Sequence, residues 1–100
     1  MTGANIMANV NYWFGYWVSA SDADALAPGD AHSWVAWPYS YGEAIGISAS
    51  ATEPGEEHIL AVENVSLQDD LNGRRMLFSV RNVGRSLVNG YGIGYSHISQ

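Results

Sequence analysis

The sequence predicts an all-β protein, an antiparallel β-sandwich of about six or seven strands. Three observations predict it. Val, Ile, Tyr and Trp are frequent beside 11 glycines, a composition that favours strands and tight turns over helices. Several segments alternate apolar and polar residues with a period of two, and turn signals containing Gly, Pro or Asn separate them. At 100 residues the chain is one domain, residues 1–100, with a single core.

The first predicted strand has aromatic residues on both faces. The predicted strands are 9–19, 31–37, 43–52, 58–68, 74–83 and 86–98. In the first, one face carries Val10, Tyr12, Phe14, Tyr16 and Val18, and the other carries Asn9, Asn11, Trp13, Gly15 and Trp17. One face must therefore meet the core and the other a loop, a partner or a ligand. We expect the tryptophans to face outward, under a loop.

An acidic loop follows, with a turn at Pro28-Gly29. Its Asp22, Asp24 and Asp30 raise the question of a bound cation, because hard cations bind clustered oxygens. In a calcium-binding EF-hand loop, however, the next alternate position is an oxygen ligand, and Leu26 occupies it. We expect a solvated loop, and a bound cation is the alternative.

The candidate ligand-binding residues lie where Pro38 ends the second predicted strand. They are Trp34, Trp37, Tyr39 and Tyr41. Aromatic rings on a connection present a large contact area at little entropic cost and can stack on sugars or dock partners. The alternative is that these rings cover the core. Their solvent exposure distinguishes the two interpretations.

The Asn72-Gly73 pair predicts a type I′ hairpin turn between the fourth and fifth strands. The pairs that follow from it are Leu71 with Arg74, Asp69 with Met76, Leu67 with Phe78, and Val65 with Val80. The apolar alternation changes phase near Glu63-Asn64, which predicts a bulge there or a change of burial.

The last strand carries Gly90, Gly92 and Gly94 on one face. A glycine row weakens a strand unless something approaches its backbone closely. We expect a buried Trp side chain there, with a neighbouring subunit or a ligand as the alternatives.

Charge and motifs argue against several function classes. All ten acids lie in residues 1–73 and all four arginines in residues 74–100, with no lysine and a net charge of −6, which disfavours nucleic-acid binding. No apolar run approaches the roughly 20 residues of a membrane span. No cysteine, nucleophile elbow or phosphate-binding loop is present, so we predict neither an enzyme nor a cofactor. A metal site formed by His32, His58 and His97 is disfavoured, because a lone His on a strand is more often a hydrogen-bonded surface or core residue than a metal ligand.

The segment LFSVRNVGRSLVNGYGIGYS, Leu77 to Ser96, resembles the strand-turn-strand of bacterial immunoglobulin-like modules of the cell-adhesion-related (CARDB) type. The resemblance implies an immunoglobulin-like β-sandwich that serves as a spacer or binding module of an extracellular protein, and it transfers no catalytic residues. The N-terminal residues show no secretory leader, so localisation is not assigned.

The sequence thus predicts a non-catalytic binding or adhesion module for a glycan or a protein ligand. In the carbohydrate version, the four aromatic residues around Pro38 form the stacking platform. The alternative is a purely structural subunit that assembles into a homo-oligomer. A small enzyme with an unrecognised site is third, and it requires a polar pocket with converging His and acidic groups.

Overall fold

The computed structural model describes residues 9–36, 44–55, 57–70 and 73–99, and they form an all-β structure. The strands are β1 (Asn9–Val18), β2 (Ala31–Ala36), β3 (Ala44–Ala51), β4 (Leu60–Asp70), β5 (Gly73–Asn82) and β6 (Gly90–Ser99). A 3-10 turn, η2 (Asp22–Asp24), lies in the acidic loop. The all-β prediction is confirmed, and each predicted strand overlaps an observed one. The largest difference at a strand end is in β6, which begins at Gly90.

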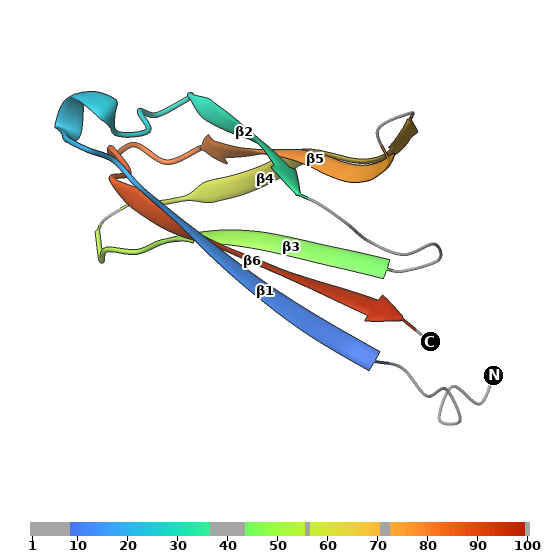
Figure 1. Ribbon diagram of the computed structural model, residues 1–100. Coiled ribbons are helices and arrows are strands. Elements are labelled where there is room, and N and C mark those ends of the chain that lie inside the picture. Colours follow the sequence, from blue (N-terminus) through green and yellow to red (C-terminus); the bar gives the residue numbers. More distant parts are fainter. Residues whose placement is uncertain (1–8, 37–43, 56, 71–72, 100) are drawn as a thin grey trace.

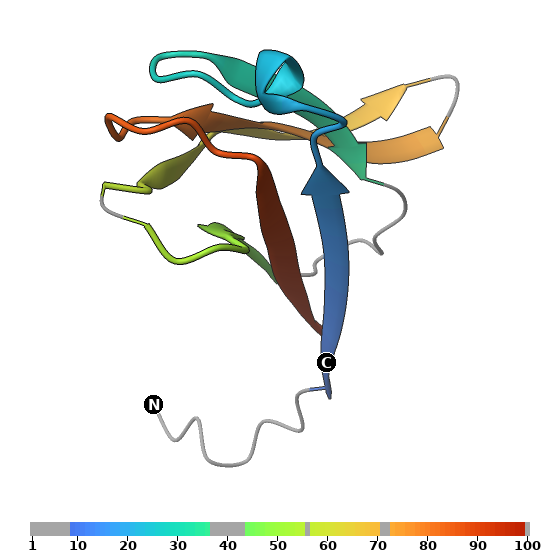
Figure 2. The ribbon, with the colours of Figure 1, turned by 90° about the vertical axis from the view of Figure 1, so that its left-hand side faces the viewer.

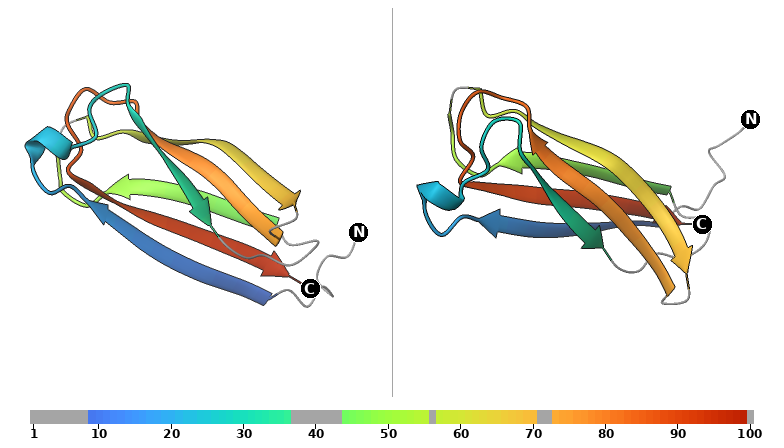
Figure 3. Two further views of the ribbon diagram at one scale, coloured as in Figure 1. Left: turned by 45° about the horizontal axis from the view of Figure 1, so that its top comes forward. Right: turned by 90° about the horizontal axis from the view of Figure 1, so that it is seen from above.

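The strands form two antiparallel sheets of three strands each. The first sheet has the order β1-β6-β3 and the second the order β2-β5-β4. Figure 1 shows the second sheet above the first, and Figure 2 shows the two layers from the side. Seen from above, their strands run in different directions (Figure 3). Among the described strands, only β4 and β5 are neighbours both in sequence and in a sheet, and every other pair of consecutive strands is divided between the two sheets.

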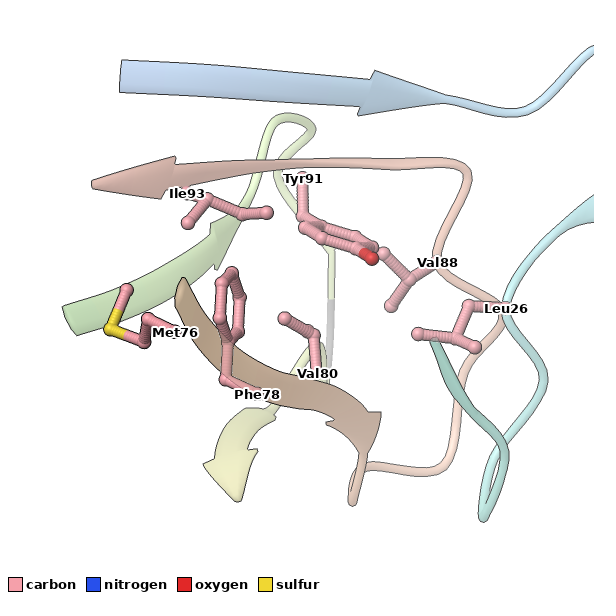
Figure 4. Packing of buried hydrophobic residues seen from close by; sticks show 7 residues of the cluster. All are labelled: Leu26, Met76, Phe78, Val80, Val88, Tyr91 and Ile93. Carbon is pink, nitrogen blue, oxygen red and sulfur yellow. The ribbon is translucent and has the colours of Figure 1, made fainter. Parts of the chain in front are cut away.

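The core lies between the central strands β5 and β6, each of which has a neighbour on both sides. Alternate residues of these strands point inward because side chains on a strand alternate between its faces. Seven apolar side chains are buried among the described residues: Leu26, Met76, Phe78, Val80, Val88, Tyr91 and Ile93. Figure 4 shows them in the space between the two sheets.

Leu26 and Val88 close one end of this core. Their backbones form a two-way bridge, from Leu26 N to Val88 O at 2.9 Å and from Val88 N to Leu26 O at 3.0 Å. Nearby, the buried Asn82 donates from Nδ2 to the carbonyl oxygens of Leu26 at 2.9 Å and Ser86 at 2.8 Å. Its Oδ1 accepts from Gly84 N at 3.0 Å. This buried amide thus has partners for both its donor and its acceptor atoms, as a buried polar group requires.

The β4–β5 register differs from the predicted one by two residues. Asp70 pairs with Gly73, Asp69 with Arg74 and Leu67 with Met76, so Gly73 belongs to β5 and not to the loop. Leu71 and Asn72 lie outside the described residues. The observed register sets Asp69 against Arg74, with Oδ1 and Nε 3.4 Å apart, whereas the predicted one would set this carboxylate against buried Met76.

The predicted bulge in β4 is confirmed. The β4–β5 ladder shifts between Glu63 and Ser66, and Asn64 has a positive φ of 57°. Because the bulge adds one residue to β4, Val62 pairs with Val80 and points toward the core. The predicted pairing of Val65 with Val80 is wrong, and Val65 is exposed.

The separation of charge along the sequence brings opposite charges together across β4 and β5. Arg81 Nε donates to Glu63 Oε1 at 2.6 Å, in addition to the Arg74–Asp69 pair. The second sheet therefore holds charged residues in both of these strands. None of the strands of the first sheet contains Asp, Glu, Lys or Arg.

Candidate functional site

The structure describes one of the four predicted platform residues. Trp34 lies in β2 and is half-buried against the core, and its Nε1 donates to Tyr91 Oη at 2.8 Å. Trp37, Tyr39 and Tyr41 lie outside the described residues. The predicted platform stays a prediction, with Trp34 placed at the inner side of the second sheet.

Trp34 belongs to an aromatic cluster that joins the two sheets. The cluster consists of Trp17 from β1, Tyr91 from β6, and His32 and Trp34 from β2. The ring centroids of Trp17 and His32 lie 4.5 Å apart in an edge-on contact, and those of Trp17 and Tyr91 lie 5.1 Å apart. The Tyr91 hydroxyl also contacts His32 Nδ1 at 2.7 Å. The cluster thus links the layers by both ring packing and hydrogen bonds.

Burial sets the protonation states inside this cluster. It raises the pKa of the Tyr91 phenol to about 12, partly opposed by the hydrogen bond from Trp34. It also lowers the pKa of His32, partly opposed by the nearby negative charge of Asp30. At neutral pH both groups are therefore uncharged. The Tyr91 side chain is fully buried and its hydroxyl contacts two residues of the opposite sheet, so the cluster holds the two sheets together.

The strand β1 directs Phe14 and Tyr16 outward, whereas we expected the face with the tryptophans to point outward. Trp17 packs against the core, whereas the side chains of Phe14 and Tyr16 are 76% and 74% exposed. The reason is that the indole of Trp17 completes the cluster with His32 and Tyr91, which only an inward side chain can reach.

A shallow groove lies on the outer face of the first sheet. It consists of two adjoining hollows of about 320 and 430 Å³, which share Phe14, Ser48 and Gly94. The rings of Phe14 and Tyr16 form one side, Gly92 and Gly94 lie in the middle, and hydroxyl groups line the other side. The hydroxyl residues are Ser48, Ser50 and Thr52, with Ser96 in the smaller hollow.

The glycines of β6 allow the two rings to lie over its backbone. Phe14 pairs with Gly94, and Tyr16 pairs with Gly92. A Cβ atom at Gly92 would lie 3.2 Å from Tyr16 Cε1, and one at Gly94 would lie 3.4 Å from Phe14 Cε1. The close approach predicted for the glycine row therefore exists, but it comes from exposed Phe and Tyr rings of β1 and not from a buried Trp.

The groove differs in chemistry from a metal or anion site. No charged residue occurs in β1, β3 or β6, so its polar groups are hydroxyls and backbone amides. Within the described ranges, no three His, Asp or Glu side chains are grouped so as to hold a metal ion. Asp22 and Asp24 are exposed in η2, where Ser21 Oγ donates to Asp24 Oδ2 at 3.3 Å. Among these same residues, no helix has the length and apolar character to cross a membrane.

Neither family models, nor curated protein sequences, nor solved structures gave a match to this chain. The groove itself was missed by sequence reasoning, although two of its signals are visible there. Aromatic residues alternate in β1, and glycines alternate in β6. What the sequence does not reveal is that these two strands are neighbours, since they lie at opposite ends of the chain.

Proposed function

We propose that this protein is a non-catalytic binding module that holds a neutral glycan in the groove on the first sheet. One observation carries the proposal: the exposed rings of Phe14 and Tyr16 lie over a glycine floor and face a row of hydroxyl groups. Ligand sites typically combine an apolar or aromatic surface with a few polar groups that fix orientation.

The chemistry of a sugar suits both sides of this groove. The C–H face of a pyranose packs on an aromatic ring, and its hydroxyls exchange hydrogen bonds with Ser and Thr side chains. Phe14 and Tyr16 each have only two side-chain torsions, so little conformational entropy is lost when a ligand orders their rings. The absence of charged residues from the three strands favours a neutral ligand over a phosphorylated or acidic one.

We also propose that the two layers form an immunoglobulin-like β-sandwich in the broad, architectural sense. Two packed antiparallel sheets support this. The strand order differs from that of antibody domains, whose sheets contain several neighbouring strands that are consecutive in sequence. Among the described strands, β4 and β5 are one such pair. The segment that resembles CARDB modules, Leu77 to Ser96, runs from β5 in one sheet to β6 in the other. If the resemblance is a true relationship, the module is extracellular.

The proposal is tested by retention on a panel of neutral polysaccharides, measured by affinity electrophoresis. Phe14→Ala and Tyr16→Ala should each weaken binding about tenfold, which corresponds to roughly 1.4 kcal/mol. Leu67→Ala is the matched control, because Leu67 is an exposed apolar residue in the second sheet. Thermal unfolding of each variant shows whether the fold is kept. Retention that is unchanged in both groove variants would contradict this site.

A second arm tests the platform predicted around Pro38. If Trp37→Ala abolishes retention in a folded protein while Phe14→Ala does not, the glycan binds at that platform and not in the groove. The absence of retention by the wild-type protein on every polysaccharide favours the structural-subunit alternative.

A further inference from the structure

Of the four sheet edges in the described structure, the one formed by β1 is the least protected. The edge strands are β1 and β3 in the first sheet and β2 and β4 in the second. An edge strand presents unpaired backbone N–H and C=O groups that can pair with another chain. Natural proteins usually block such pairing with charges, short strands, prolines, bulges or a covering element.

The other three edges each have such a feature. The strand β4 carries Glu63, Asp69 and a bulge. The strand β2 has only six residues. The strand β3 contacts β4 of the opposite sheet, which limits access to its edge.

The edge of β1 shows none of these features among the described residues. It is ten residues long, contains no charged residue and no proline, and pairs with β6 without a register shift. It also exposes Phe14, Tyr16 and Val18 on its outer face. In a chain of net charge −6, an uncharged strand is the segment on which two copies meet with the least electrostatic repulsion. A second copy of this chain is therefore the occupant that the edge favours.

We propose that β1 pairs antiparallel with β1 of a second copy, with Phe14 on the two-fold axis. A two-fold axis perpendicular to the sheet keeps the same face of both copies on one side. Opposite residues of an antiparallel pair share a face, so even-numbered residues must stand opposite even-numbered ones. Only axes at residue 13 or residue 14 satisfy this condition and still pair nine residues of the strand.

Self-complementarity selects residue 14. Among the even-numbered residues, this register sets Phe14 against Phe14, Tyr12 against Tyr16, and Val10 against Val18. Among the odd-numbered residues it sets Trp13 against Gly15. The space beside Gly15 is open, since a Cβ atom added to Gly15 would meet nothing within 4 Å. The alternative register would set the two Trp13 residues directly against each other.

The pairing extends the first sheet to six strands in the order β3-β6-β1-β1-β6-β3. Because the axis is perpendicular to the sheet, the two outer grooves lie on the same side of it. The dimer would therefore present two grooves to one extended ligand. The dimer itself does not depend on the glycan proposal.

The first test measures self-association by sedimentation over a range of protein concentrations. The wild type should be a dimer. Gly15→Lys should raise the dissociation constant by at least about tenfold, because it places two charges in the paired strands. Gly46→Lys is the matched control, because Gly46 lies in the opposite edge strand β3 and tolerates a side chain: a Cβ atom there would lie 3.5 Å from Ser96 Oγ, an ordinary van der Waals distance.

The second test uses the absence of cysteine from the chain. Under oxidation, Phe14→Cys should form a covalent dimer, because residue 14 stands opposite itself. Tyr16→Cys should not, because in this register its two copies are offset by four residues, about 13 Å along the strands. A wild-type protein that stays monomeric, or a dimer that Gly15→Lys leaves intact, overturns the interface. Cross-linking through Tyr16→Cys and not through Phe14→Cys overturns the register.

These outcomes are separate from those of the glycan test. Gly15 does not line the groove, so a monomeric Gly15→Lys protein should still be retained by a polysaccharide that the wild type binds.

Discussion

Tyr91 joins the two sheets by hydrogen bonds. Its ring packs beside Trp17 within the first sheet, and its hydroxyl reaches Trp34 and His32 of the second. Burying a phenol is favourable only if its hydroxyl finds partners, and here it finds two. The same burial keeps His32 neutral, so the cluster depends on pH through this histidine.

The first prediction concerns this pH dependence. Burial lowers the pKa of His32 in the folded protein below its ordinary value of 6.5, so the unfolded chain binds the proton at a higher pH. Folding thus favours neutral His32. The full stability is present above pH 6.5, where the unfolded chain also holds this histidine neutral, and part of it is lost as the pH falls through 6.5 toward the lowered pKa. Urea unfolding at about pH 7.5 and about pH 5.5 should therefore show lower stability at the acidic pH.

The variants that check this assignment are His32→Gln and His58→Gln. The first should remove most of the difference between the two pH values, whereas the second should retain it. The His58 ring is the suitable control because it lies outside the aromatic cluster, and its Nδ1 contacts the carbonyl oxygen of Glu53 at 3.2 Å at an exposed site. An equal pH difference in His32→Gln and the wild type would contradict the role of His32.

At the scale of the element, the bulge in β4 reconciles two conflicting alternations. Before the bulge, the alternation directs Val62 toward the core. After the bulge, it sets Asp69 opposite Arg74 of β5. A strand without the extra residue would turn one of these sets to the wrong face. Asn64 takes the left-handed conformation that this requires, which Asn tolerates better than most residues.

The second prediction follows from this backbone conformation. Asn64→Val should lower the free energy of unfolding by about 1–2 kcal/mol, because a β-branched residue strongly disfavours positive φ. Asn64→Gly should be close to neutral. Gln68→Val, at an exposed position of the same strand outside the bulge, is the control and should also be close to neutral. Urea unfolding measures all three, and equal stabilities of the two Val variants would contradict the bulge.

The predictability of the elements varies along the chain for physical reasons. Strand positions depend on local alternation, and they are close to the predicted ones. The hairpin register depends on which residues of β5 are buried and on the bulge that lets β4 follow them, so the Asn72-Gly73 signal alone was insufficient. The groove depends on the pairing of β1 with β6, which no local pattern encodes.

At the scale of the whole molecule, the described core is small and the exposed apolar surface is large. Seven apolar side chains are buried among the described residues, while Phe14, Tyr16 and Val18 are exposed on one face of one edge strand. Single domains of this size have a limited margin of stability. Association through β1 would therefore add stability as well as a binding surface.

The third prediction compares a core residue with a surface residue. Phe78→Ala should lower the free energy of unfolding by about 3–5 kcal/mol, because Phe78 lies between the sheets at 5% exposure. Leu67→Ala should cost less than about 1 kcal/mol, because Leu67 is 48% exposed. Thermal and urea unfolding compare the two variants. Similar losses would mean that Leu67 is covered in solution, which would point to an interface on the second sheet.

The sequence by itself determined the all-β class, the approximate strands, the bulge in β4 and the need for something to cover the glycines of β6. These properties follow from alternation, turn residues and backbone sterics, which act between residues that are close along the chain. Tertiary structure alone decided which face of β1 is buried, because that depends on Trp17 meeting His32 of the opposite sheet and Tyr91 of the neighbouring strand β6. It also decided that Phe14 and Tyr16 lie over Gly94 and Gly92, since only the pairing of the two ends of the chain brings them together.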